Sequence, residues 1–177
     1  MSNGVADSFW NWAEVKYGRG GVKDMCLDLQ DNSDQSVPLL LWAAWCAASG
    51  VRIDTHVAYR AAAMARAWSD AVIKPLRIVR GTLSTALHDS EDGECAGLRD
   101  QVTSAELQAE HALMNQLESL IPECPSSSTS NLKANTLGAL QVVTTAWAEV
   151  PPMQHLPIVM PGFTQGLTKS ENLRYNG

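Results

Sequence analysis

The stretch from Val37 to Ala48 constrains the fold of this chain more than any other, because none of its twelve residues is charged or strongly polar. A helix at the surface of a protein carries polar residues on one face, at every third or fourth position. A helix without them is expected to be buried on nearly all sides, at the centre of a bundle. Ser36 and Pro38 mark its start and Gly50 its end. The run is too short to span a membrane, which takes roughly 20 apolar residues.

The composition is consistent with one domain and with a surface poor in charge. The 177 residues fit a single domain of ordinary size. Only 18% of them are charged, against about 25% in an average protein. The chain is therefore expected either to bury an unusual share of itself or to present an apolar surface to a partner. The net charge of −6 argues against nucleic-acid binding, which depends on Lys and Arg neutralising phosphates.

The N-terminus and the four cysteines favour a cytoplasmic protein that is not bound to a membrane. No basic region followed by an apolar run is present at the start, as a signal peptide would require. Cys26 and Cys46 lie among apolar neighbours and are expected to be small core residues. Cys95 and Cys124 flank a predicted helix over residues 98–121, which would hold them roughly 36 Å apart. That is too far for a disulfide bond, which needs Cα atoms within about 7 Å.

Apolar residues at spacings of three and four predict further helices on both sides of the central one. Asp7 or Ser8 is a suitable N-cap for the first helix, and Asp54 for the longest one. Pro75 lies inside that longest helix and is expected to kink it without breaking it. The sequence thus predicts an all-α fold, a compact bundle of about six orthogonal and antiparallel helices. The predicted helices cover residues 9–17, 22–29, 37–48, 54–87, 98–121 and 132–148.

The segments between and after these helices contain acidic residues, glycine and proline. Residues 88–97 carry four carboxylates and are predicted to form an exposed acidic loop. Beyond residue 148 the frequency of proline and glycine excludes a regular element. We therefore expect a helical domain over residues 1–148, followed by an irregular segment over 149–177. That segment is either a tail or a strap laid over the bundle.

Charged residues on the longest predicted helix form one stripe. Five of them follow each other at steps of 4, 4, 3 and 3, which places them on one helical face. If the following helix returns antiparallel from a turn near Gly93, counting residues outward from that turn pairs Arg80 with Glu106 and Arg77 with Glu110. The five residues of the stripe are Arg66, Asp70, Lys74, Arg77 and Arg80.

Two interpretations of these predicted ion pairs remain open. In the first, the pairs form a structural ladder that fixes the register of two helices. In the second, the arginines bind an anion or a phosphate through their planar bidentate geometry, and the glutamates orient them. A double charge swap, Arg80→Glu with Glu106→Arg, distinguishes the two. Restored stability together with a lost response to ligand favours the anion site.

Several short motifs occur in order over roughly residues 9–121, and together they resemble a known family. The family consists of small, uncharacterised, mostly helical proteobacterial proteins, and it is defined as a domain of unknown function. The resemblance implies a cytoplasmic helical protein and supplies no activity, substrate or catalytic residue. The motifs are Trp12-x-x-x-x-Tyr17, Gly21-Val22-x-x-x-Cys26-Leu27-x-Leu29-Gln30-Asp31, Val37-x-Leu39-Leu40-Leu41-Trp42, Pro75-Leu76-Arg77-x-Val79-Arg80 and Glu106-Leu107-x-Ala109-Glu110.

Two functions remain under consideration. The first is a protein-interaction or adaptor module without catalysis of its own, which docks an unidentified protein partner through apolar surface. The alternative is a protein or enzyme that binds a small anionic ligand, such as a phosphate-bearing metabolite, in a cleft between helices. No catalytic residue, metal site or cofactor is indicated: the acids at 28, 31 and 34 lack the glycine and closing glutamate of a calcium loop. The candidate ligand-binding residues are Gln30, Asp31, Arg77, Arg80, Glu106 and Glu110.

Overall fold

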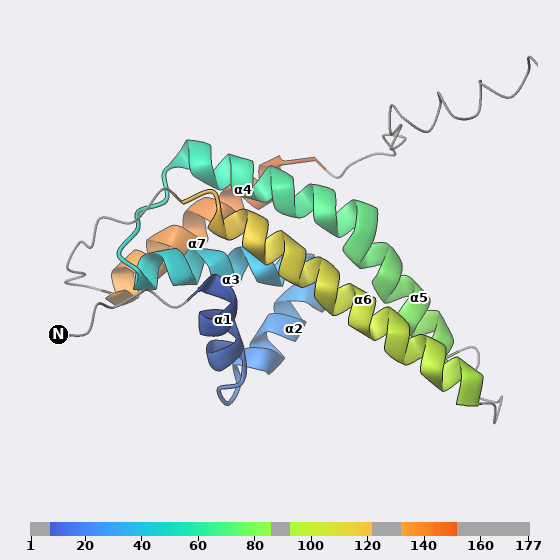
Figure 1. The fold of residues 1–177 in the computed structure, drawn as a ribbon. Helices are drawn as coiled ribbons and strands as arrows, with labels where there is room; N and C mark the ends of the chain where they lie inside the picture. Colours follow the sequence, from blue (N-terminus) through green and yellow to red (C-terminus); the bar gives the residue numbers. More distant parts are fainter. Residues whose placement is uncertain (1–7, 86–92, 122–131, 152–177) are drawn as a thin grey trace, which may run out of the picture.

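The computed structural model describes residues 8–85, 93–121 and 132–151, and every regular element in these ranges is helical (Figure 1). The all-α prediction is confirmed. Helices α4 and α5 are joined by a π-helical turn, η1, into one rod, so the described residues form the six predicted helices. The elements are α1 (Phe9–Tyr17), α2 (Val22–Ser33), α3 (Val37–Ala48), α4 (Thr55–Trp68), η1 (Ser69–Ile73), α5 (Lys74–Thr85), α6 (Gly93–Glu118) and α7 (Leu132–Glu149).

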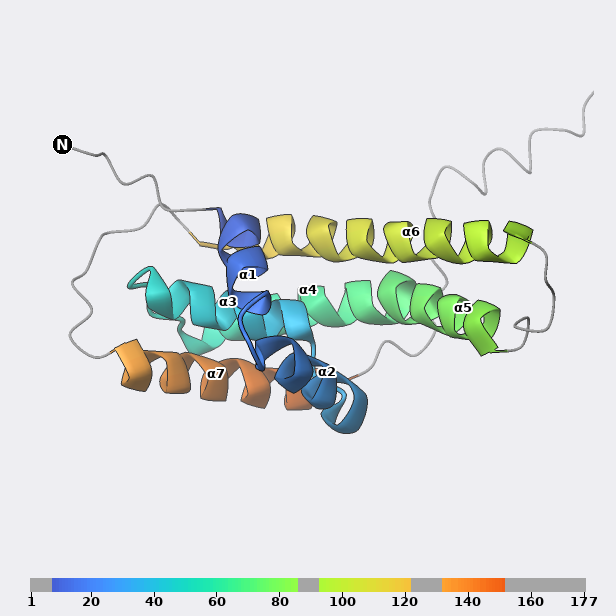
Figure 2. The same cartoon turned by 90° about the horizontal axis from the view of Figure 1, so that it is seen from below.

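The apolar helix α3 lies at the centre of the bundle, as its composition predicts. It packs against α7, α6 and α1, and more lightly against α2 and α4 (Figure 2). Trp42 is 0% exposed and Trp45 is 7% exposed, so the predicted burial of both rings is confirmed. Full burial of a large apolar side chain contributes about 1.5–3 kcal/mol. Helix α3 therefore contributes a large part of the hydrophobic stability of the fold.

Glycine ends α3 in the manner that the sequence indicates. Gly50 follows the helix with φ +78°, a left-handed conformation that glycine adopts without strain. The N–H of Val51 donates to the carbonyl of Cys46 at 2.8 Å, and the N–H of Gly50 donates to that of Ala47 at 3.2 Å. These two bonds form a Schellman motif, which satisfies the last carbonyls of the helix.

The predicted N-caps are also present. The hydroxyl of Ser8 accepts a hydrogen bond from the N–H of Asn11 at 3.3 Å, at the start of α1. The carboxylate of Asp54 accepts one from the N–H of Val57 at 2.8 Å, at the start of α4. Each bond satisfies a backbone donor that has no partner inside the helix.

Pro75 bends the long rod without breaking it, as predicted. Its ring removes the N–H that would bond to the carbonyl of Ala71. The turn before it, Ser69–Ile73, is a π-helix, whose wider hydrogen-bonding pattern accommodates the missing donor. The helical assignment continues from Thr55 to Thr85, and the rod curves where α4 meets α5 (Figure 1).

Helix α6 begins earlier in the chain than predicted. It begins at Gly93, whereas the sequence predicted an acidic loop up to residue 97 and a helix from 98. Gly93 and Gly97 lower helix propensity by about 1 kcal/mol each. Helix α6 packs along α5, and this tertiary contact outweighs the propensity of the glycines. The other residues of the predicted loop, 88–92, lie outside the described residues, as does Cys124.

Helix α2 covers the predicted residues 22–29 but continues four residues farther, to Ser33, and Asp34 ends it in a left-handed conformation. Two of the four residues in its apolar stripe, Val22, Met25, Cys26 and Leu29, are exposed. Cys26 is buried, as expected, whereas Met25 is 60% exposed and Leu29 is 36% exposed. Helix α2 lies at the edge of the bundle and packs only against α1 and α3 among the described elements. The spacing of its apolar residues therefore predicted a helix correctly, while the number of neighbours decided how little of it is covered.

Helix α5 and the first half of α6 form a two-helix arm that projects from the rest of the bundle (Figures 1 and 2). We define the arm as α5 with residues 93–105 of α6, and the body as the other described helices with the remainder of α6. Among the described helices, α5 packs against η1 and α6 only. Its first residue, Lys74, also forms an ion pair with Asp34 at the end of α2. None of the arm side chains that the structure describes is buried.

Within the described ranges, no helix combines the length and the apolar character that crossing a bilayer requires. Helix α7 ends at Glu149, one residue beyond the predicted end of the helical domain. Residues 152–177 lie outside the described residues, so the irregular tail or strap stays a prediction.

Candidate functional site

Four of the six predicted ligand-binding residues line one cavity of about 240 Å³, which we call the polar cleft. Gln30 and Asp31 reach it from α2, Arg77 from α5 and Glu110 from α6. The other two, Arg80 and Glu106, do not line the cleft. They lie about one helical turn farther along α5 and α6 and are connected to it through Arg77. The structure therefore gathers the predicted set, with four residues at the cleft and two beside it.

Both predicted ion pairs between α5 and α6 are confirmed. Arg80 Nε lies 2.7 Å from Glu106 Oε2, and Arg77 Nη2 lies 3.3 Å from Glu110 Oε1. A third contact was not predicted: Arg77 Nε lies 3.0 Å from Glu106 Oε1. Glu106 is only 8% exposed and joins both arginines. The two cations and two carboxylates neutralise each other, which supports the interpretation of a ladder that fixes helix register.

The surroundings of these groups raise the pKa of one arginine and of one glutamate, for different physical reasons. The hydrogen bond from Arg80 to Glu106 raises the pKa of the Arg80 guanidinium. Burial raises the pKa of the Glu110 carboxyl, and nearby Glu106 adds to this effect, whereas Arg77 opposes it. Glu110 therefore holds its negative charge less readily than an exposed glutamate does.

A second ionic cluster, centred on Asp34, was not predicted as a unit. Asp34 ends α2 with φ +48°, in the left-handed region that few side chains adopt. Its carboxylate lies 2.9 Å from Lys74 Nζ and 3.2 Å from Arg66 Nη1. The hydrogen bond from Lys74 lowers the pKa of the Asp34 carboxyl. The indole N–H of Trp147 donates to the backbone carbonyl of Asp34 at 2.8 Å.

Arg66 is the buried member of this cluster. It is 5% exposed, and its Nη2 donates to the carbonyl of Trp147 at 3.1 Å. Its guanidinium carbon lies 3.5 Å from the centre of the Trp147 ring, a cation–π arrangement. Arg66 thus connects the ends of α2, α4 and α7. The sequence placed Arg66 on the charged stripe, but its partner Asp34 lies 32 residues away on another helix.

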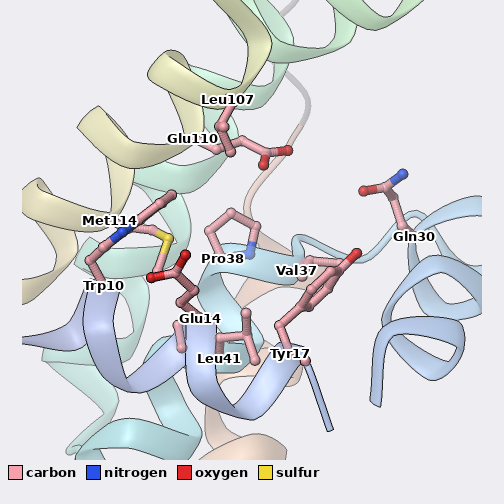
Figure 3. Close-up of a pocket in the computed structure, with 12 residues that line it drawn as sticks. Trp10, Glu14, Tyr17, Gln30, Val37, Pro38, Leu41, Leu107, Glu110 and Met114 are labelled. Atoms are coloured by element: carbon pink, nitrogen blue, oxygen red, sulfur yellow. The ribbon is translucent and has the colours of Figure 1, made fainter. Parts of the chain in front are cut away.

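A larger cavity of about 440 Å³, which we call the apolar groove, lies between α1, α2, α3 and α6 (Figure 3). Its walls are mostly apolar, and Gln30 and Glu110 line both this groove and the polar cleft. Glu14, Gly18 and Leu107 are exposed and line it too, so the groove opens to the surface. Its other lining residues are Trp10, Ala13, Tyr17, Val37, Pro38, Leu41 and Met114.

Two carboxylates and two aromatic rings give this groove its chemical character. The carboxylates of Glu14 and Glu110 point into the space between the walls, and Trp10 and Tyr17 stand beside it (Figure 3). Burial raises the pKa of the Tyr17 phenol, and the nearby Cys26, Glu110 and Asp24 add to this effect. Tyr17 therefore stays neutral at physiological pH. No described residue that lines the groove is a lysine, an arginine or a histidine.

The groove was not found from the sequence. The sequence patterns did not single out Trp10, Glu14 or Tyr17 as parts of a site. One signal was available: Trp10, Glu14 and Tyr17 are spaced by four and three residues, so they share one face of α1. The other wall comes from α3 and α6, which no local spacing connects to α1.

Residues 8–117 match a family model whose description is "Protein of unknown function (DUF2390)". The chain belongs to this family. The matched segment includes every residue that lines the apolar groove and all of the polar cleft except Trp147. Helix α7 lies beyond the matched segment of this DUF2390 protein, although it packs on α3 and α4. Comparisons with curated proteins and with solved structures found no match.

Proposed function

We propose that this DUF2390 protein is a protein-interaction module that docks an apolar segment of a partner protein in the apolar groove. The observation that supports this most is the groove of about 440 Å³ between α1 and α6, with its apolar walls. On this proposal the protein acts as an adaptor and has no catalysis of its own.

Exposed apolar side chains also occur elsewhere on α1 and α2, the helices that contribute Trp10, Tyr17 and Gln30 to the groove. Val15 on α1 and Met25 on α2 are 61% and 60% exposed, and Leu27 and Leu29 on α2 are also exposed. Apolar surface that is gathered on neighbouring elements and bordered by polar residues is typical of sites that bind another protein. Methionine adapts to partners of different shape, which suits Met25 and Met114 to such a surface.

The shape of the groove favours a peptide segment over a buried small molecule. A groove that is open along one side and walled by helices accepts the apolar face of an extended or helical segment. Leu107 is 54% exposed and lies at the border of the groove, so it contacts such a segment without contributing to the core.

The test is a retention experiment from native lysate with the whole chain, wild type and two variants. Leu107→Glu places a charge at the border of the groove, whereas Leu132→Glu places the same charge on α7, where Leu132 is 49% exposed and outside the groove. A partner that docks in the groove is retained by the wild type and by Leu132→Glu and is lost with Leu107→Glu. Crosslinks from position 107 then map to one segment of that partner. Equal retention by both variants, or none by the wild type, contradicts the proposal.

A small anionic ligand in the polar cleft is the second candidate. The convergence of Gln30, Asp31, Arg77 and Glu110 on one cavity favours it. The engagement of Arg77 by two carboxylates opposes it, because an anion must compete with both. Inorganic phosphate or ATP at about 100 times Kd should add about 2.7 kcal/mol to the stability. The matching rise in Tm should be absent in Arg77→Gln, and no rise in the wild type rejects this candidate.

A further inference from the structure

We propose that the apolar groove selects a cation: the docked segment presents a lysine or arginine side chain to Glu14 and Glu110, between the rings of Trp10 and Tyr17. This inference rests on the proposed function and specifies the chemistry of the partner segment. It follows from the charges that line the groove and from the rings beside them.

The charges around the groove leave one carboxylate without a partner. Arg77 and Arg80 are matched by Glu106 and Glu110 through the contacts at the base of the arm. Glu14 has no ion pair with any described residue, and it lines the same cavity as Glu110. Counted over the described residues, the groove therefore holds one negative charge in excess before a guest arrives.

The excess charge determines whether a neutral, a cationic or an anionic side chain binds in the groove at the lowest cost. A neutral apolar segment that covers Glu14 removes water from a carboxylate and returns no hydrogen bond, which is costly. A cationic side chain restores the lost solvation with charge-assisted hydrogen bonds. An anionic guest adds repulsion to the same cost. Glu110 can take part as well, because among the described residues only Arg77 pairs with it, and Arg77 reaches Oε1 alone.

The aromatic rings favour the same guest. Trp10 and Tyr17 lie one turn before and one turn after Glu14 on the same face of α1, and both line the groove. The His111 ring packs against Trp10, with 4.1 Å between the ring centres, so a guest meets the rest of the Trp10 ring. The negative face of an aromatic ring attracts ammonium and guanidinium groups. The alkyl stem of lysine or arginine packs on apolar surface while its charged end reaches a carboxylate. Leu41 and Met114 supply that apolar surface in the groove.

The experiment compares three probes of one size on the whole chain: benzylamine, benzyl alcohol and benzoate. Amide and indole NMR signals report binding, and the indole N–H of Trp10 reports the groove. Benzylamine, which is protonated at neutral pH, is expected to shift the Trp10 signal with a Kd about tenfold lower than that of benzyl alcohol. Benzoate is expected to leave the signal unchanged.

Two matched variants assign the selection to the groove. Glu14→Gln removes an exposed charge that makes no ion pair with the described residues, so folding is preserved and the preference for benzylamine should disappear. Glu149→Gln, an exposed glutamate at the end of α7, should keep it. Equal binding of benzylamine and benzyl alcohol, tighter binding of benzoate, no shift with any probe at millimolar concentration, or an unchanged preference in Glu14→Gln overturns the inference.

These outcomes separate the inference from the function on which it rests. If a protein is retained through Leu107 but benzylamine is not preferred, the groove docks a neutral segment and only the inference is wrong. If benzylamine is preferred and no protein is retained, the protein-interaction function is wrong and the groove is a site for a small amine.

Discussion

The body and the arm of this protein are held together by different forces, and α6 belongs to both. In the body, Leu113 and Leu117 of α6 are 1% and 0% exposed. In the arm, Leu98 of the same helix is 49% exposed, and α5 has no buried residue. The body is therefore stabilised by hydrophobic burial. The arm depends on the pairing of α5 with α6, where Glu106 holds Arg77 and Arg80.

A single continuous helix such as α6 therefore need not be equally stable along its whole length. Segments with few buried apolar contacts open at lower free energy than the core of the same protein. The arm is expected to open locally while the body stays folded. The ion pairs at its base set the limit of that opening, because Glu106 is buried and its charge is costly without the arginines.

The largest expected effect compares two leucines of α6. Leu113→Ala should lower the free energy of unfolding by about 3–4 kcal/mol, because it leaves a cavity in the packed body. Leu98→Ala should lower it by less than about 0.5 kcal/mol, because the side chain is half exposed. Urea denaturation measures both. Similar losses for the two variants would show that the arm is packed as tightly as the body.

Loss of the buried guanidinium of the body should have the next largest effect. Arg66→Met removes the contacts with Asp34 and with the carbonyl and ring of Trp147 and is expected to cost about 2–3 kcal/mol. Thermal unfolding measures the loss, and a shift of the NMR signal of the Trp147 indole N–H locates it at Trp147. Arg60→Met, an exposed arginine on the same helix, is the control and should change little.

A substitution at the base of the arm should destabilise the arm and leave the rest of the body unchanged. Glu106→Gln weakens the contacts with Arg77 and Arg80 and is expected to cost about 1–2 kcal/mol. Amide hydrogen exchange should speed up along α5 and stay unchanged along α7. The swap Arg80→Glu with Glu106→Arg should restore only part of the protection, because the new arginine faces Arg77. Full restoration would show that the contact between Arg77 and Glu106 contributes nothing.

Acid should lower the free energy of unfolding of the body, because it protonates the carboxylate of Asp34. The pKa of Asp34 is lower in the folded protein than in the unfolded chain, so its contribution is complete above about pH 4. The contribution is lost as the pH falls further, through the lowered pKa of the folded state. Because the side chain is 63% exposed, screening keeps the effect below about 1 kcal/mol. Denaturation of the wild type and of Asp34→Asn over pH 2–6 should show a steeper loss for the wild type.

The smallest expected effect is a gain in the arm. Gly97 lies inside α6, and a Cβ at this position meets nothing within 4 Å. Gly97→Ala should therefore stabilise the helix by about 0.5–1 kcal/mol. Hydrogen exchange of residues 93–100 measures the gain. A loss of stability would mean that the helix begins near 98, as the sequence alone predicted.

The parts of this protein that the sequence predicted well are those with a strong helical period. The charge-free run of α3 required burial, and its tryptophans are buried. Arg80 was matched to Glu106 by counting residues across an antiparallel turn, which works because the period of a helix determines which face a side chain occupies. The start of α6 was predicted five residues late because glycine and acidic residues resemble a loop, and only its packing against α5 shows otherwise.

Local spacing in the sequence predicted the helices and the register of one hairpin, because these depend on residues within a few turns of chain. The contacts of Arg66 with Asp34 and Trp147 are visible only in the folded protein. The same holds for the groove that Glu14 and Glu110 share with Trp10 and Tyr17. Those contacts depend on how helices far apart in the chain pack against one another, and no local periodicity specifies that packing.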